Sequence, residues 1–267
     1  MTRRIIKLVI SAAFWACSAA WQVVLKVFGR PIPGRCVVLY YHVVRPEERE
    51  RFARQMDILL ALAQPISIEN PPELTPGVHY AAVTFDDGFR ETIESVLPEM
   101  KKRNIPITVF LPTGCLGAEP PWISDRPSHH YGGGILAEDE IRKIDAEPLV
   151  SFGSHCIMHR PLPTLSDDEA RDEIFRSKAD LEKALGHGVE SLSFPHGAFG
   201  QRHVDWAREA GYRRVYSIES SAALLHPDEF VTGRFRVDST DWRMEFQLKI
   251  LGSYRWLSLM KRGRMNA

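Results

Sequence analysis

The sequence has few cysteines and no excess of charge of either sign. Only 4 of its 267 residues are cysteine, and they are widely separated, without the paired spacing of a zinc ribbon. A chain of this length needs no disulfide framework, so we expect none. Lysine and arginine number 34, as do aspartate and glutamate, and the formal net charge is zero. That balance provides no general attraction for nucleic acid, so we expect no nucleic-acid partner.

The N-terminal segment differs from the rest of the chain. Residues 8–25 carry no charged side chain, and this run is near the shortest length that crosses a bilayer as a helix. Three interpretations compete: a signal anchor that spans the membrane, a cleaved signal peptide, and a helix that lies in the headgroup layer. A fourth is a helix that packs, buried, on the domain. A narrow polar stripe at helical spacing suits the headgroup layer, and its members are Lys7, Ser11, Ser18, Gln22 and Lys26.

We predict that residues 5–28 form an uncleaved membrane anchor, and the sequence does not decide whether it spans the membrane or lies flat. The expected location is a membrane or the cell envelope, with the cytoplasmic face of the membrane as an alternative. The predicted parts of the chain are an anchor or signal segment with its linker over 1–34, the main domain over 35–252, and a basic amphipathic tail over 253–267. The tail has two interpretations, a helix on an anionic membrane surface and a helix packed on the main domain.

Beyond residue 35 the hydrophobic pattern alternates between buried strands and amphipathic helices. Apolar runs predict strands at 36–41, 81–85, 107–111, 149–152, 191–194, 214–217 and 231–237. Helical spacing predicts helices at 47–63, 90–103, 135–146 and 203–210, and a longer one that begins at a capping box of Ser166 and Glu169. A long loop over 112–134 is of the length that often carries function. Repeated strand–helix units predict an α/β fold, namely a distorted (β/α) barrel of about seven parallel strands, similar to a TIM barrel and preceded by a hydrophobic helix.

Polar side chains gather at the ends of four predicted strands. In a parallel α/β barrel the carboxyl ends of the strands open on one face, so residues far apart in the sequence converge there. Two adjacent acids and two histidines at i, i+4 spacing then look like a two-histidine, one-carboxylate metal site with open positions for water. The residues at these strand ends are His42, Asp86, Asp87, His155, His159 and His196.

These residues stand in motifs that resemble the polysaccharide deacetylase family, the NodB-homology domain of carbohydrate esterase family 4. The similar segments are TFDDGF at residues 84–89, GSHCIMHRPL at 153–162 and SFPHGAF at 193–199. LYYHVV at 39–44 resembles the opening strand of the subgroup whose domain begins with Tyr-His. The resemblance spans about residues 36–252, and its first two motifs are highly specific in this order and spacing.

The resemblance implies a role for each of these residues. Asp86 aligns with the catalytic base, and His196 stands where the family has a tyrosine whose backbone N–H lines the oxyanion hole. Many members carry the general acid in a Leu-x-His strand near the C-terminus, but none follows Trp242, so His42 is expected to be the acid. The aligned metal ligands are Asp87, His155 and His159; the expected metal is zinc, with cobalt, nickel, manganese or iron as alternatives. Residues expected to contact the substrate are Pro195, Gly197 and Trp242.

One position departs from the family pattern. Ser193 occupies the place of an arginine that orients the base, and we expect Arg234 or Arg236 to replace it. The resemblance implies a metal-dependent hydrolase that removes N-acetyl or similar N-acyl groups from amino sugars of a polysaccharide or glycolipid, so the expected partner is an N-acetylated glycan. Two alternatives stay open: an O-acetyl esterase that acts on a glycan, and a non-catalytic carbohydrate-binding or assembly protein with a decayed site.

Overall fold

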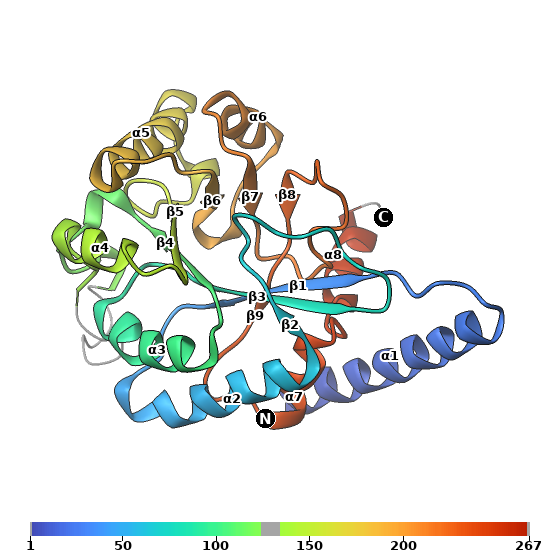
Figure 1. The fold of residues 1–267 in the computed structure, drawn as a ribbon. Helices are drawn as coiled ribbons and strands as arrows, with labels where there is room; N and C mark the ends of the chain where they lie inside the picture. The colour runs from blue at the N-terminus through green and yellow to red at the C-terminus, as the bar shows by residue number, and fades with distance from the viewer. Residues whose placement is uncertain (1, 124–133, 266–267) are drawn as a thin grey trace.

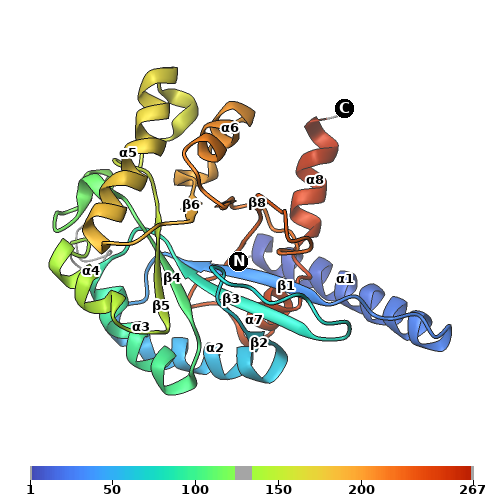
Figure 2. The same ribbon diagram turned by 45° about the horizontal axis from the view of Figure 1, so that its top comes forward.

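A single parallel sheet organises the molecule. The computed structural model describes residues 2–123 and 134–265. Within these residues the strands are β1 (Arg35–Tyr41), β2 (Gln64–Pro65), β3 (His79–Phe85), β4 (Ile107–Leu111), β5 (Val150–Ser154), β6 (Ser191–Ser193), β7 (Arg214–Tyr216), β8 (Val231–Thr232) and β9 (Phe235–Arg236). They pair in the order β8-β7-β6-β5-β4-β3-β1-β9, with β2 also on β3 and every pairing parallel. The sheet curls into an incomplete barrel, as Figures 1 and 2 show.

Helices cover the outside of the curled sheet. Those that follow the strands are α2 (Arg49–Leu62), α3 (Arg90–Arg103), α4 (Glu138–Asp145), α5 (Asp167–Leu185) and α6 (Gln201–Glu209). The predicted capping box starts α5: the Ser166 hydroxyl accepts from the Glu169 N–H, and the Glu169 carboxylate accepts from the Ser166 N–H. Three more helices flank the barrel, α1 (Thr2–Val27), α7 (Arg243–Ile250) and α8 (Trp256–Met265).

Side chains along the strands alternate between two apolar clusters. One cluster lies between the sheet and the surrounding helices, and on the two longest strands, β1 and β3, it contains Val37, Leu39, Tyr41, Ala81, Val83 and Phe85. The other fills the inside of the barrel, and on these strands it contains Cys36, Val38, Tyr80 and Ala82. Because successive side chains of a strand point to opposite faces, even-numbered residues of β1 and β3 face the interior.

The barrel stays open between β8 and β9. These strands are separated by only Gly233 and Arg234, yet β8 pairs with β7 and β9 pairs with β1, at opposite edges of the sheet. A Cβ on Gly233 would lie 2.2 Å from the backbone carbonyl oxygen of Glu219, so the crossing requires glycine. The single strand predicted over 231–237 is therefore wrong: two short strands flank the opening.

The predicted fold class is otherwise confirmed, as a curled, barrel-like parallel sheet with helices outside and an N-terminal apolar helix. The predicted elements at 90–103 and 107–111 match α3 and β4 residue for residue. Part of the predicted long loop, residues 124–133, lies outside the described residues.

The N-terminal helix is neither free nor buried. Of the helices described, α1 is long and apolar enough to cross a membrane by length and composition, and only 6% of its most apolar window is buried. Its polar stripe, which one of the interpretations placed against lipid headgroups, faces the domain: Ser11 is buried and accepts a 2.8 Å hydrogen bond from Trp256 Nε1. The helix therefore docks through its polar side, and apolar side chains such as Trp21 are left exposed.

Candidate metal centre

The interior face of β1 and β3 carries two of the predicted site residues. The alternation that places Tyr40 and Thr84 inside the barrel continues to His42 and Asp86, directly beyond the two strand ends. The Asp86 N–H donates to the Tyr41 carbonyl at 2.9 Å, so the parallel pairing extends past β3. Residues 44 positions apart in the sequence thus leave adjacent strands at the same level.

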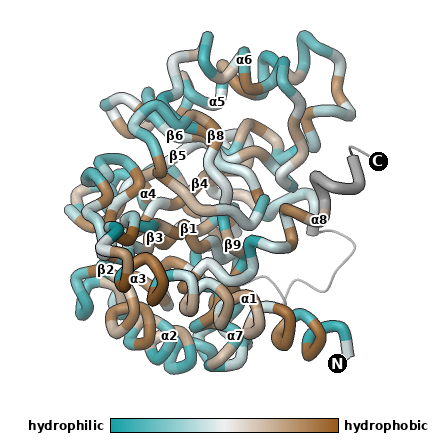
Figure 3. Tube along the Cα trace, turned by 90° about the vertical axis from the view of Figure 1, so that its right-hand side faces the viewer, coloured by the Kyte–Doolittle hydropathy of each residue, from teal (hydrophilic) through white to brown (hydrophobic). Residues whose placement is uncertain are grey.

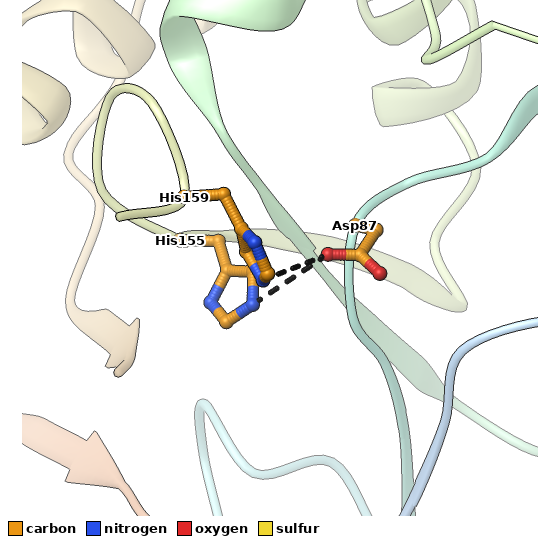
Figure 4. A group of neighbouring side chains, drawn as sticks. All are labelled: Asp87, His155 and His159. Carbon is orange, nitrogen blue, oxygen red and sulfur yellow. Dashed lines mark ion pairs between the residues drawn. The ribbon is translucent and has the colours of Figure 1, made fainter. Parts of the chain in front are cut away.

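Asp87, His155 and His159 converge on one point. The Nε2 atoms of His155 and His159 lie 3.7 and 3.3 Å from Oδ1 of Asp87. Figure 4 shows both imidazoles, which come from the loop after β5, directed at this carboxylate. The three side chains are buried, and their potential ligand atoms all lie within 4.8 Å of one another.

The electrostatics of this trio fit a divalent cation. Burial lowers the pKa of His155 to about 4 and that of His159 to about 2, so both imidazoles are neutral at pH 7 and have lone pairs to donate. His155 Nδ1 lies 2.6 Å from the Ser193 carbonyl, which assigns its proton to that nitrogen and leaves Nε2 as the lone-pair donor. Burial, and then the neighbouring Asp86, raise the pKa of Asp87 well above its usual value. Asp87 Oδ1 has no hydrogen-bond partner among the described residues, as expected of an atom that a cation would satisfy.

The backbone around the trio is strained. Among the described residues six non-glycine residues have positive φ, and four of them lie here: Asp87, Cys156, His159 and His196. L-residues adopt this region at an energetic cost, and such residues concentrate at functional sites.

A buried arginine replaces the one missing from the third motif. Arg234 enters through the opening between β8 and β9 and is 0% exposed. Its Nη1 and Nη2 donate to the two oxygens of Asp86 at 2.7 and 2.8 Å. The remaining N–H groups donate to the Thr84 hydroxyl at 3.1 Å, the Ser193 hydroxyl at 2.7 Å and the Ser217 carbonyl at 3.3 Å. All five guanidinium donors are therefore used.

These contacts decide between the two candidate arginines and explain Ser193. Arg236 is largely exposed and pairs with Asp238, so Arg234 is the residue that contacts the acid. Ser193 does not leave a gap, because its small hydroxyl accepts from the arginine that arrives from elsewhere. Burial alone would raise the pKa of Asp86, but Arg234, with smaller contributions from His155 and His42, outweighs it and lowers the pKa to about 2.

A buried carboxylate on α5 holds the loop that carries the two histidines. Glu173 accepts hydrogen bonds from the Ile157 N–H at 2.6 Å and the Met158 N–H at 2.9 Å, and from Arg160 Nε at 3.1 Å. It is 2% exposed. Sequence reasoning missed Glu173, since on its helix it resembles the surrounding solvated acids.

His159 lies between two other rings. The ring centroid of Trp122 is 4.2 Å from that of His159 in a stacked arrangement, and the centroid of His196 is 4.4 Å away. Trp122 was also missed, because a tryptophan in a long loop carries no positional signal. Next to His196, Pro195 is buried, and Gly197 has φ +62° with no room for a Cβ, which would lie 2.2 Å from Ile218.

The two remaining predicted site residues, His42 and Trp242, lie in surroundings that differ from each other. Burial lowers the pKa of His42, with Asp86 opposing this shift, so its imidazole is neutral at pH 7. Trp242 lies under the guanidinium of Arg4, at 4.5 Å from Cζ to the ring centroid, and lines a separate cavity of about 630 Å³ beside α2. Its predicted contact with substrate remains a prediction.

Comparisons with known proteins identify the family of this chain. The family model described as polysaccharide deacetylase matches residues 74–215, more than half of the chain. A protein named as a polysaccharide deacetylase, YxkH of Bacillus subtilis, is 24% identical over 162 residues, which cover 61% of this chain and 53% of that protein. The poly-β-1,6-N-acetyl-D-glucosamine N-deacetylase of Staphylococcus aureus is 21% identical over 163 residues, 58% of this chain and 53% of that protein.

A solved structure shares the fold. The structure of IcaB from Ammonifex degensii superposes with a TM-score of 0.68 at 21% identity and covers 84% of this chain and 98% of that one. The chain spans about half the length of the curated relatives it matches. The family match begins after His42 and ends before Arg234. These two residues are therefore assigned to the site from their positions in the structure.

Proposed function

This chain belongs to the polysaccharide deacetylase family, and we propose from that premise that it is a metal-dependent hydrolase that removes N-acetyl or similar N-acyl groups from amino sugars. The observation that carries the proposal is the buried trio of Asp87, His155 and His159, with its unsatisfied carboxylate oxygen. We propose these three residues as the metal ligands and zinc as the metal, because two imidazoles and a carboxylate suit it.

The surrounding residues supply the proton transfers. A divalent cation at the trio would polarise the acyl carbonyl and acidify the attacking water. Asp86, held ionised by Arg234, would accept the proton of that water. His42 is neutral at rest, so it would take up the proton that Asp86 received from the water and pass it to the departing amine. The backbone N–H of His196 would stabilise the developing oxyanion, a type of contribution worth about 3 kcal/mol.

The intact Arg234–Asp86 pair argues against a decayed, non-catalytic site. An arginine that is fully buried and uses all its donors is costly to retain without a role, because burying charges costs several kcal/mol before pairing offsets it. A binding module would have no need to keep a carboxylate ionised beside a metal trio. The non-catalytic alternative is therefore the weakest of the three readings.

The substrate and the location are also proposals. The names of relatives such as the staphylococcal N-deacetylase suggest N-acetylglucosamine polymers as the first substrates to test, with Pro195, Gly197 and Trp242 as candidate contacts. We propose residues 35–252 as the catalytic domain, 1–34 as its membrane segment and linker, and 253–267 as an accessory tail. A membrane or cell-envelope location follows from the apolar α1.

The test is acetate release from N-acetylglucosamine oligomers by the full chain, after chelation and after zinc is restored. Zinc-dependent release that Asp86→Asn abolishes, and that Asp180→Asn retains, would support the proposal. Asp180 is a suitable control because it is exposed on α5 and belongs to no ion pair among the described residues.

The same preparation separates the alternatives. Release from O-acetylated but not N-acetylated glycans would replace the amide reaction with the ester one. Failure to bind zinc in proportion to protein, together with no release from either class, would refute the hydrolase and support a binding module.

A further inference from the structure

A basic cavity lies between α1 and the barrel, at the end opposite the metal trio. It has a volume of about 380 Å³ and is lined by the first residues of β1 and β3, Arg35 and His79, by Arg255 and by Lys26 of α1. None of the described residues that line it is acidic. Among the described residues there is no ion-pair partner for any of the three basic side chains, Arg35, Arg255 and Lys26. The cavity therefore concentrates positive charge that the protein itself does not neutralise.

The two arginines are close enough to repel one another. Partial burial, and then the charge of Arg255, lower the pKa of Arg35. Two like charges that share a partly buried cavity are destabilising unless an anion joins them. Ser18 and Gln22 of the α1 polar stripe also line the cavity and add neutral hydrogen-bonding groups. This combination of guanidinium, ammonium and hydroxyl groups matches the chemistry of a phosphate.

The N-terminal half of α1 is held against the domain, whereas its C-terminal end extends past the barrel (Figures 1 and 2). Near its start, Arg4 Nε donates to Glu245 of α7 at 2.7 Å. Further along, Ser11 accepts from Trp256, and the Arg255 guanidinium lies 4.8 Å from the Phe14 ring. The cavity then continues along the helix to Lys26. With its first half held to a charged domain, the helix has too few remaining residues to cross the hydrocarbon core of a bilayer, which takes about 20.

The opposite side of α1 is exposed and apolar. In Figure 3 the helix is hydrophilic at its N-terminal end and hydrophobic in the turns that follow. Two neighbouring residues of α8 are exposed as well. The exposed apolar side chains on this side are Ile5, Ile6, Val9, Ile10, Trp21, Val23, Val24, Val27, Phe28, Leu259 and Met260. Such a face, with a tryptophan among its members and basic residues behind it, is typical of a helix that lies in the membrane interface.

We propose that α1 lies flat in the headgroup layer, with the domain on its polar side, and that the cavity of Arg35, Arg255 and Lys26 binds the phosphate of an anionic lipid headgroup. The occupant is a membrane lipid rather than free phosphate, because the cavity opens beside the exposed apolar face of the same helix. The inference does not depend on the proposed catalysis. It has one structural consequence, which is that the seven-residue β1 and β3 separate the phosphate from the metal trio by about 20 Å.

The first test measures binding of the full chain to two kinds of vesicle, phosphatidylcholine alone and phosphatidylcholine mixed with phosphatidylglycerol. We expect tighter binding to the anionic vesicles. Each basic residue near such a surface contributes a factor of about five, so Arg35→Gln/Arg255→Gln should lose about 30-fold. The matched control is Arg176→Gln/Lys183→Gln, which removes the same charge from the exposed side of α5 and should lose little.

Two further variants keep the result interpretable. Arg35→Lys/Arg255→Lys retains the charge and should recover most of the affinity. Thermal unfolding of each variant identifies loss of fold. Equal losses in the cavity and control variants would overturn the phosphate site, and so would a cavity variant that is folded and binds anionic vesicles normally. If, at constant ionic strength, the cavity variants lost affinity for inorganic phosphate but kept their affinity for anionic vesicles, the site would be assigned to free phosphate and the lipid would be refuted.

The second test reads the depth of α1 from a natural probe. Of the four cysteines, Cys17 is exposed and the other three are buried, so a thiol-reactive fluorophore labels the middle of α1. Lipids with quenchers at shallow or deep acyl positions then report its depth. A flat helix places the probe where the shallow quencher acts more strongly. Stronger quenching from the deep position would show that α1 spans the bilayer and would overturn the proposal.

Discussion

Substitution of Arg234 by methionine removes the charge that contributes most to balancing Asp86 in the barrel interior. Arg234 is 0% exposed and Asp86 3% exposed, so solvent cannot replace the lost hydrogen bonds. Methionine fills a similar volume among Tyr40, Phe110 and Tyr216, the rings that surround the guanidinium. The variant therefore tests charge rather than packing.

The size of the effect follows from the pKa of Asp86. Its shift from 3.8 to about 2 corresponds to about 2 kcal/mol of stability at neutral pH. Because the pKa is lowered in the folded state, this contribution is complete above pH 3.8 and is lost as the pH falls through about 2. In Arg234→Met the main opposing charge is gone, so burial raises the pKa of Asp86. Breaking a buried pair in this way costs roughly 3–5 kcal/mol.

The assay is urea unfolding at pH 7, together with the pH dependence of acetate release. For Arg234→Met we expect the free energy of unfolding to fall by roughly 3–5 kcal/mol. We also expect the acidic limb of its rate profile to move to higher pH. Arg236→Met is the matched control, since its side chain is 65% exposed and a surface pair contributes at most about 1 kcal/mol. Adding Asp86→Asn to Arg234→Met should restore part of the stability, because no buried charge remains.

Equal stability losses in the Arg234→Met and Arg236→Met variants would refute this reasoning. An unchanged acidic limb in a folded Arg234→Met protein would also refute it, since it would mean that Arg234 does not set the ionisation of Asp86.

The remaining predictions concern the metal centre. Asp87→Asn should abolish stoichiometric zinc after dialysis, measured by elemental analysis, because the amide oxygen is a weaker ligand; full retention would remove Asp87 from the ligand set. Zinc binding should release about one proton, so the logarithm of the zinc affinity should rise with pH with a slope of about one. The reason is that the pKa values of His155 and His159 are already about 4 and about 2, whereas that of Asp87 is raised. A slope of two protons would contradict those imidazole pKa values. Glu173→Gln should weaken zinc binding about 10- to 100-fold by loosening the loop between the histidines, as measured by competition with a chelating dye. Asp180→Asn, exposed on the same helix, is its control, and an equal effect there would rule out the proposed role of Glu173.

Local chemistry explains why much of the fold could be predicted. The apolar run of β4 and the helical spacing of α3 act over a few residues, so their bounds were correct. The capping box of Ser166 and Glu169 is likewise a contact between residues three apart. The prediction of one strand over 231–237 was wrong because β8 and β9 pair with strands at opposite edges of the sheet, which no local pattern contains.

The polar stripe of α1 shows the same limit. Helical spacing predicted correctly which residues share one side of the helix, including Ser11 and Gln22. It could not predict what that side would face. The partner, Trp256, lies 245 positions away, and its hydrogen bond turns the stripe toward the domain and the apolar side outward.

The sequence by itself determined the parallel βα architecture, the strand ends that carry Asp86, Asp87, His155 and His159, and the amphipathic nature of α1. Only the tertiary structure decided that Arg234 rather than Arg236 neutralises Asp86, across 148 positions of sequence, and that Glu173 anchors the histidine loop. The physical reason is that periodicity and turn chemistry are local, whereas neutralising a buried charge depends on which side chain the closed fold brings within about 3 Å of it.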